Sequence, residues 1–217
     1  MRKILISMLA IFLVIGLVGA GTLAWFQDTE TSTGNTFTAG TLDLKIRDQD
    51  EAFGDGVTAT WTATNMAPGD SWNFLTESVR LDAQGTITPD HLEITCDYSV
   101  TEEVPQTEAD TDPNTNLHPD NMAKVMEITR FVYSNGNWSI NALTDPNPRW
   151  RIQDQDGDKR ITFYDLKNDP LDDLPSPDGA TTHLELGVKF HESADSSFQG
   201  DTFNLTMIFT LNQDSSQ

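Results

Sequence analysis

The sequence predicts an all-β protein: a two-sheet antiparallel sandwich with short helical insertions. Two observations predict it. Short segments in which apolar and polar residues alternate recur along the chain, and Gly, Pro, Asp and Asn separate them. The length agrees with this fold, because about 190 residues after a leader suit one β domain that buries a core without covalent cross-links.

The chain opens with a segment typical of an export signal. Arg2 and Lys3 precede an apolar run from Ile4 to Val18, and small residues follow. The run matches a signal-peptide core and is short for a membrane-spanning helix. We expect residues 1–24 to be a signal peptide, the product to be secreted or displayed at the cell surface, and no stable membrane span to remain after cleavage. An uncleaved N-terminal anchor is the alternative.

The region after the signal is predicted to hold a tether and then a strand. Residues 25–36 read as a junction or tether, because Gln27–Asn35 is polar, and residues 37–217 read as a single β-sandwich domain. Within the first strand, the apolar residues change from odd to even positions around Gly40, which is therefore a candidate bulge. Whether this strand completes its own sheet or pairs with a neighbouring subunit is left open by the pattern.

Seven strands are expected, in chain order at 36–46, 57–64, 72–82, 91–101, 125–133, 184–190 and 202–212. The last is the clearest, because its odd positions from Phe203 to Leu211 are all apolar. In 91–101, Cys96 alternates onto the apolar face, where a cysteine packs as a small hydrophobe. The alternative is a reactive or intermolecular thiol. Cys96 is the only cysteine, so no intrachain disulfide can form.

Two insertions interrupt the strands. Residues 101–120 are acidic and Pro-rich with few core-forming side chains, which predicts an exposed loop. Residues 145–179 are also rich in Pro and Asp. Between the insertions, a short helix is possible from Asn121, although the same stretch also fits a strand.

The second insertion contains the sharpest chemical motif, the twelve residues from Asp154 to Asp165. Acids at positions 1, 3, 5 and 12 give the spacing of an EF-hand calcium loop, and the placement of Gly157 resembles the dockerin version. The predicted structural Ca²⁺ site comprises the side chains of three acids, the carbonyl of position 7 and the closing acid: Asp154, Asp156, Asp158, Arg160 and Asp165. A merely acidic turn is the alternative.

Position 6 of this loop departs from the pattern. It is normally Gly with a positive φ, but here it is Lys159. A lysine in that conformation costs about 1 kcal/mol and places a positive charge beside the cation. Ile161, at position 8, is expected to anchor the loop to the core. We therefore expect a weakened calcium site.

Composition narrows the function further. The chain has 13 basic and 34 acidic residues, and loss of residues 1–24 removes two basic residues and no acid, so the mature net charge is −23. Such a surface repels nucleic acid. The histidines do not form an H-E-x-x-H motif, and no G-x-S-x-G motif occurs. We therefore predict no catalytic residues. Asn137 and Asn204 lie in glycosylation sequons, which also occur by chance.

Between Gly21 and Leu44 the chain carries a G-T-x-A-x-F-x-D junction followed by an N-x-F-x-A-G-T-L-D-L strand. In these motifs it resembles the TasA/camelysin family of secreted fibre proteins. Residues 65–70 resemble the family's N-x-x-P-G-D turn, and residues 198–201 resemble its Y/F-Q-G turn. The region of roughly 101–180 is not covered by the resemblance.

This resemblance implies a jelly-roll sandwich, cleavage by a dedicated signal peptidase, and a head-to-tail homopolymer in which the N-terminal strand of one subunit inserts into the next. The function expected is that of a structural subunit of extracellular filaments, bundling pili or biofilm matrix. Because camelysin relatives have been classed as metallopeptidases, an enzyme is one alternative. A monomeric, calcium-stabilised binding protein of the cell surface is the other.

Overall fold

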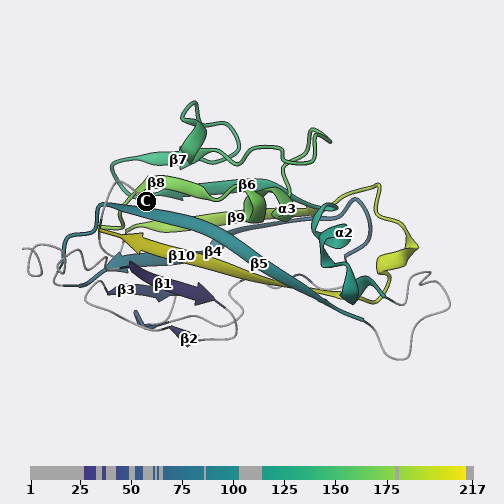
Figure 1. The fold of residues 1–217 in the computed structure, drawn as a ribbon, viewed down its shortest axis with the longest axis horizontal. Helices are drawn as coiled ribbons and strands as arrows, with labels where there is room; N and C mark the ends of the chain where they lie inside the picture. The colour runs from purple at the N-terminus through teal and green to yellow at the C-terminus, as the bar shows by residue number, and fades with distance from the viewer. Residues whose placement is uncertain are drawn as a thin grey trace, which may run out of the picture.

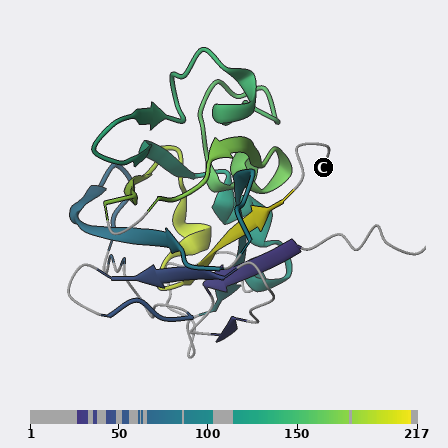
Figure 2. The same cartoon turned by 90° about the vertical axis from the view of Figure 1, so that its left-hand side faces the viewer.

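The computed structural model describes residues 27–32, 36–37, 43–48, 52–55, 61, 63, 66–85, 87–102, 114–178 and 181–213. Within them the chain forms two five-stranded sheets, and the strands pair antiparallel (Figures 1 and 2). The predicted all-β, two-sheet sandwich is thus confirmed.

The first sheet has the strand order β2-β1-β10-β5-β8. Its strands are β2 (Thr36–Phe37), β1 (Gln27–Ser32), β10 (Thr202–Asn212), β5 (His91–Thr101) and β8 (Leu171–Pro175). Strands β5 and β10 pair over their whole length and run side by side along the long axis of the molecule (Figure 1). This sheet carries the N-terminal strand on one side and β8 on the other.

The second sheet has the order β3-β4-β9-β6-β7. Its strands are β3 (Leu44–Arg47), β4 (Ser71–Ala83), β9 (His183–Phe190), β6 (Met126–Ser134) and β7 (Ser139–Asn141). Short helices lie in the connections: η1 (Thr115–Leu117), α2 (Pro119–Ala123), η2 (Pro148–Trp150), α3 (Phe163–Asn168) and η3 (Ser196–Phe198). Both interpretations of the stretch after Asn121 hold in part, because α2 ends just before β6 begins.

The core lies between the sheets and follows the predicted alternation. Even positions of β5 and odd positions of β10 turn inward, and so do the even positions of β9. Cys96 is 2% exposed, which confirms its predicted place in the core. The inward residues of these three strands are Leu92, Ile94, Cys96, Tyr98, Val100, Leu184, Leu186, Val188, Phe190, Met207, Phe209 and Leu211.

The strand predictions differ from the structure in four places. Strand β1 forms from residues expected in the tether, β7 forms after the strand expected at 125–133, and β8 forms inside the second predicted insertion. Between 57 and 64 the described residues, Trp61 and Ala63, are not in a strand. Strand β1 is polar, and the buried residues of β8, Leu171 and Leu174, are three apart and do not alternate. Pairing with β10 and β5, not an alternating apolar pattern, therefore creates β1 and β8. Gly40 and the signal segment 1–24 lie outside the described residues.

One bulge explains an irregular pattern in β6. The pairing of β6 with β9 shifts between Ile128 and Arg130, so the inward positions change from even to odd along the strand. Gly187 of β9 faces this bulge, and a Cβ placed there would lie 2.8 Å from Cβ of Arg130 and closer still to Oδ1 of Asn73. Side chains of the two neighbouring strands therefore leave room only for glycine at this position.

Candidate functional site

The predicted calcium loop is an organised turn between η2 and α3. The carboxylate of Asp154 accepts the backbone N–H groups of Gly157 at 2.7 Å and Lys159 at 2.8 Å, so the loop closes around this side chain. Asp158 accepts the N–H of Arg160 at 2.8 Å. One carboxylate oxygen from each of Asp154, Asp156 and Asp158 lies within 4.8 Å of the others. Three of the predicted ligands are thus gathered at one place.

The backbone of the loop is left-handed, with a positive φ, at two positions. Lys159 has φ +69° and Gly157 has φ +79°. The lysine therefore holds the left-handed conformation in which glycine is preferred, as the sequence predicted. The strain is kept because the Lys159 N–H is fixed on Asp154.

Asp165 has a different role from the other acids. Its side chain is completely buried, and it accepts hydrogen bonds from Gln155 N at 2.8 Å and from Thr162 N and Oγ1, each at 2.7 Å. It thereby caps α3 and ties position 2 of the loop to position 12. Burial raises the pKa of Asp165, although these hydrogen bonds oppose the rise. The groups of metal-ligand side chains found among the described residues do not include it.

Protein cations surround the three gathered carboxylates. The Arg160 guanidinium pairs with Asp158 and also lies 2.8 Å from Nδ1 of His191. Burial raises the pKa of Asp158, but the hydrogen bonds from Arg160 outweigh it and the net pKa is lowered. Lys124 lies 3.6 Å from Asp156. An ion bound here would compete with these two side chains.

The loop is anchored to the second sheet. The carbonyl of Ile161 accepts the N–H of Ile128 of β6 at 2.7 Å, and Thr162 bridges to Glu127. The Ile161 side chain packs against the core, which confirms its predicted anchoring role. The element that pairs with this loop is therefore strand β6, whereas the loop of an EF-hand usually pairs with that of a second EF-hand.

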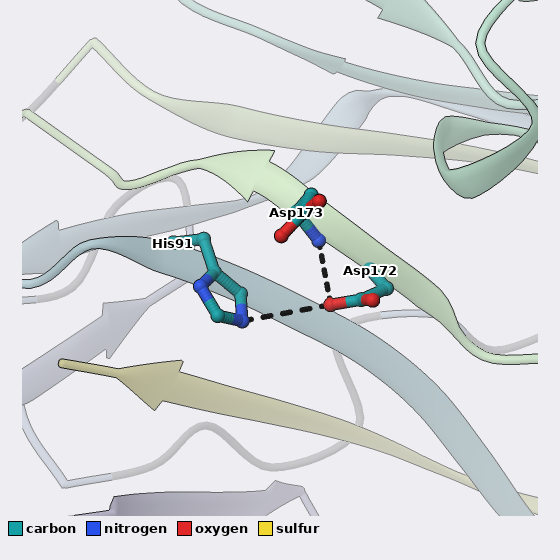
Figure 3. Close-up of side chains that lie close together, drawn as sticks. All are labelled: His91, Asp172 and Asp173. Atoms are coloured by element: carbon teal, nitrogen blue, oxygen red, sulfur yellow. Dashed lines mark hydrogen bonds and ion pairs between the residues drawn. The ribbon is translucent and has the colours of Figure 1, made fainter. Parts of the chain in front are cut away.

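A second cluster of metal-ligand side chains was not predicted. His91, at the start of β5, lies beside Asp172 and Asp173 of the neighbouring edge strand β8 (Figure 3). The imidazole is 3% exposed although it lies on the outward face of the sheet. Nε2 is 3.5 Å from Oδ1 of Asp172 and 3.7 Å from Oε1 of Glu93. The histidine and the aspartates are about 80 residues apart in the chain, so no local spacing could reveal them.

A bulge in β8 brings the two aspartates together. Leu92 pairs with Leu174 and Ile94 with Leu171, so Asp172 and Asp173 together oppose the single residue between them on β5. Asp173 has φ +55°, which interrupts the alternation of a regular strand. Burial, followed by the charge of Asp172, raises the pKa of Glu93.

Comparison with known families gives one finding. A family model described as "Camelysin metallo-endopeptidase" matches residues 1–217, the whole of the sequence. No curated protein matches the chain. Within the residues that the structure describes, no helix is both long and apolar enough to cross a membrane.

Proposed function

Because this chain belongs to the camelysin metallo-endopeptidase family, the TasA/camelysin family that its N-terminal motif resembles, we propose that it is a secreted structural subunit of extracellular filaments or matrix. The subunits polymerise head to tail when β1 of one molecule pairs with β10 of the next. The self-association and the handling by a dedicated signal peptidase are both part of this proposal.

The pairing of β1 with β10 carries the proposal. Six residues of β1 pair antiparallel with β10, from Gln27 opposite Asn212 to Ser32 opposite Met207. In Figure 2, β1 (purple) lies beside β10 (yellow). An identical strand from a neighbouring subunit can make the same backbone hydrogen bonds, so exchange replaces one set of contacts with an equal set.

Exchange of this kind produces a filament. The donor strand and the acceptor edge are different surfaces of the same molecule, so each subunit gives one strand and receives one. Such heterologous contacts form an open filament when the rotation from one subunit to the next does not close, and a ring when it does. The first strand was expected at 36–46, whereas the strand that supports the proposal, Gln27–Ser32, lies in residues expected to form the tether.

Cross-strand cysteines test the exchange directly. Thr29 pairs with Thr210, and partner Cα atoms in antiparallel strands lie about 4.5–5.5 Å apart, a distance that a disulfide spans. In a Cys96→Ala background, Thr29→Cys chains mixed with Thr210→Cys chains should form disulfides between chains as filaments grow. Thr29→Cys with Met207→Cys is the control, because those positions are three residues out of register, about 10 Å.

Two results would contradict the proposal. One is filament growth, seen by electron microscopy, from a chain that lacks residues 25–36. The other is filaments in which a Thr29→Cys, Thr210→Cys double variant forms disulfides only within each chain. A monomer that never assembles would instead favour the alternative of a monomeric surface protein.

We also propose that the loop from Asp154 to Asp165 binds Ca²⁺ in a structural role. The gathered carboxylates support it, because hard oxygen ligands suit this ion. Calcium should raise the melting temperature, and Asp156→Ala with Asp158→Ala should abolish that rise. Asp97→Ala with Glu192→Ala is the matched control, since both side chains are exposed acids outside the loop. An equal loss in the control would contradict the calcium site.

The peptidase activity in the family's description is a second candidate function. Known catalytic zinc sites use ligand sets such as three histidines, or two histidines and a glutamate. The two groups of candidate ligands among the described residues contain one histidine between them. We therefore favour the structural role, and chelator-sensitive cleavage of a protein substrate by the purified chain is the result that would reverse this preference.

A further inference from the structure

The cluster around His91 places an imidazole among several carboxylates on the outward face of the first sheet. Strand β5 turns its even positions inward, so His91 and Glu93 point outward, and Asn212 and Thr210 of β10 lie opposite them. The imidazole is nevertheless buried by its neighbours. A nearly buried polar group must find hydrogen-bond partners or a bound ion, so the partners of the two ring nitrogens decide what this imidazole can bind.

The hydrogen bonds of the ring indicate which nitrogen is unprotonated. Nδ1 lies 3.2 Å from Oδ2 of Asp90, a carboxylate that can only accept, so Nδ1 carries the proton. Nε2 lies 3.2 Å from Nδ2 of Asn212, an amide nitrogen that can only donate. Nε2 is therefore the unprotonated nitrogen, and an ion bound there would take the place of the Asn212 hydrogen bond. A carboxylate on the far nitrogen is the arrangement that orients most metal-binding histidines.

The spacing at Nε2 suits an ion between the groups. The distances of 3.5 Å to Asp172 and 3.7 Å to Glu93 exceed those of good hydrogen bonds. Zinc bonds of about 2.0–2.2 Å in tetrahedral geometry separate two ligand atoms by about 3.4 Å.

The bulge in β8 fixes the two aspartates. Asp173 keeps its positive φ, and its carbonyl accepts a hydrogen bond from Nε1 of Trp150 at 2.8 Å. Its backbone N–H donates to Oδ1 of Asp172 at 2.7 Å (Figure 3). Arg149 pairs with the Oδ2 atoms of both aspartates. The outer oxygens are thus held by a guanidinium, and Oδ1 of Asp172 is directed toward His91.

We propose that His91 Nε2, Asp172 and Asp173 bind a divalent transition-metal ion of the Zn²⁺ class, with Glu93 as a further carboxylate and Asp90 as the partner that orients the imidazole. An imidazole ligand distinguishes this site from the all-oxygen calcium loop. The proposal does not depend on filament assembly, and hydrolysis is not part of it.

Calorimetric titration of Zn²⁺ into the purified, chelator-treated chain at neutral pH tests the site. We expect saturable binding of one ion, and at least a tenfold loss of affinity in both His91→Gln and Asp172→Asn. Asp90→Asn should retain binding with roughly tenfold lower affinity, because it alters only the orienting partner. If His91→Gln does not fold, Asp172→Asn still decides the result, because the Asp172 side chain is more exposed than that of His91.

Two further variants separate this site from adventitious binding. His183→Gln is the matched control, because His183 also lies near a carboxylate, 3.6 Å from Glu185, but in the other sheet. Its zinc affinity should be unchanged. Arg149→Gln should bind zinc more tightly, because a competing cation is removed while every ligand remains.

Cobalt provides a second readout. Co²⁺ in a site with a nitrogen ligand should give a visible absorption band that His91→Gln and Asp172→Asn abolish and His183→Gln retains. The proposal is overturned if zinc affinity is the same in Asp172→Asn as in the unaltered chain, or if the loss occurs equally in His183→Gln.

Discussion

Two residues other than glycine have a positive φ among those that the structure describes, and each lies in one of the two clusters of candidate metal ligands. Lys159 is at position 6 of the acidic loop, and Asp173 is in the β8 bulge. Aspartate tolerates this conformation better than lysine does, because its short polar side chain can hydrogen-bond locally. Retained strain at such positions points to local geometry that the rest of the fold enforces.

The strain at Lys159 predicts opposite effects for two neighbouring substitutions. Lys159→Gly should stabilise the loop by up to about 1 kcal/mol and tighten calcium binding, because it relieves the backbone and removes a positive charge. Gly157→Ala should destabilise it by about 1 kcal/mol, since φ is +79° there although a Cβ would meet no atom within 4 Å. Thermal unfolding with and without calcium measures both. Effects of the same sign would contradict the assignment of strain.

Cys96 should be chemically inert in the folded protein. Its thiol is 2% exposed and lies 3.5 Å from the carbonyl of Phe163, and burial raises its pKa well above the usual range. The thiolate that reacts with disulfide reagents is therefore scarce at about pH 8. We expect no labelling by an aromatic disulfide reagent until denaturant is added. Rapid labelling of the native chain would show that β5 opens locally.

At the scale of strands, Gly187 is the position where a single methyl group should be most damaging. A Cβ there would lie 2.8 Å from Cβ of Arg130, at the bulge where β6 changes phase. Gly187→Ala should lower the free energy of unfolding by about 1–3 kcal/mol, the range seen for overpacking. Denaturant titration measures it. Gly136→Ala is the control, because a Cβ at Gly136 would meet no atom within 4 Å.

The strands also show what a sequence pattern can and cannot predict. The bounds of β5 and β10 were predicted to the residue, since both turn one continuous apolar face to the core. Strand β1 has no such face in its sequence, QDTETS, and exists through its pairing with a strand almost the whole chain away. Patterns report burial of side chains, whereas backbone pairing leaves little trace in them.

The same difference separates the two candidate sites. The loop of Asp154 lies within twelve consecutive residues, so its spacing alone predicted three acids gathered around one point. That spacing also placed Asp165 among the ligands, where the structure shows it capping α3, because a buried carboxylate satisfies the free N–H groups at the helix start. The His91 cluster depends on which strands become neighbours, and only the fold supplies that information.

At the scale of the whole molecule, charge should control the rate of assembly. The chain carries a net charge of −21, and −23 without residues 1–24, so subunits repel each other as they approach. Raising NaCl from about 0.1 to 1 M shortens the screening length from about 10 Å to 3 Å. We therefore expect faster filament growth by light scattering, with a chelator present so that the metal sites stay empty. Slower growth in high salt would contradict electrostatic control.

The position of β10 has a consequence for the order of events in the life of the chain. This strand pairs with β5 on one side and with β1 on the other, yet among the residues that the structure describes it comes after every other strand. Synthesis starts at the N-terminus, so the residues of β1 are made early. The strand edge with which β1 pairs forms only after residues 202–212 have been synthesised and folded. Chains truncated before β10 would keep the donor strand β1 but would lack the acceptor edge for the β1 strand of another subunit. In a growing filament, such a chain would act as a terminator.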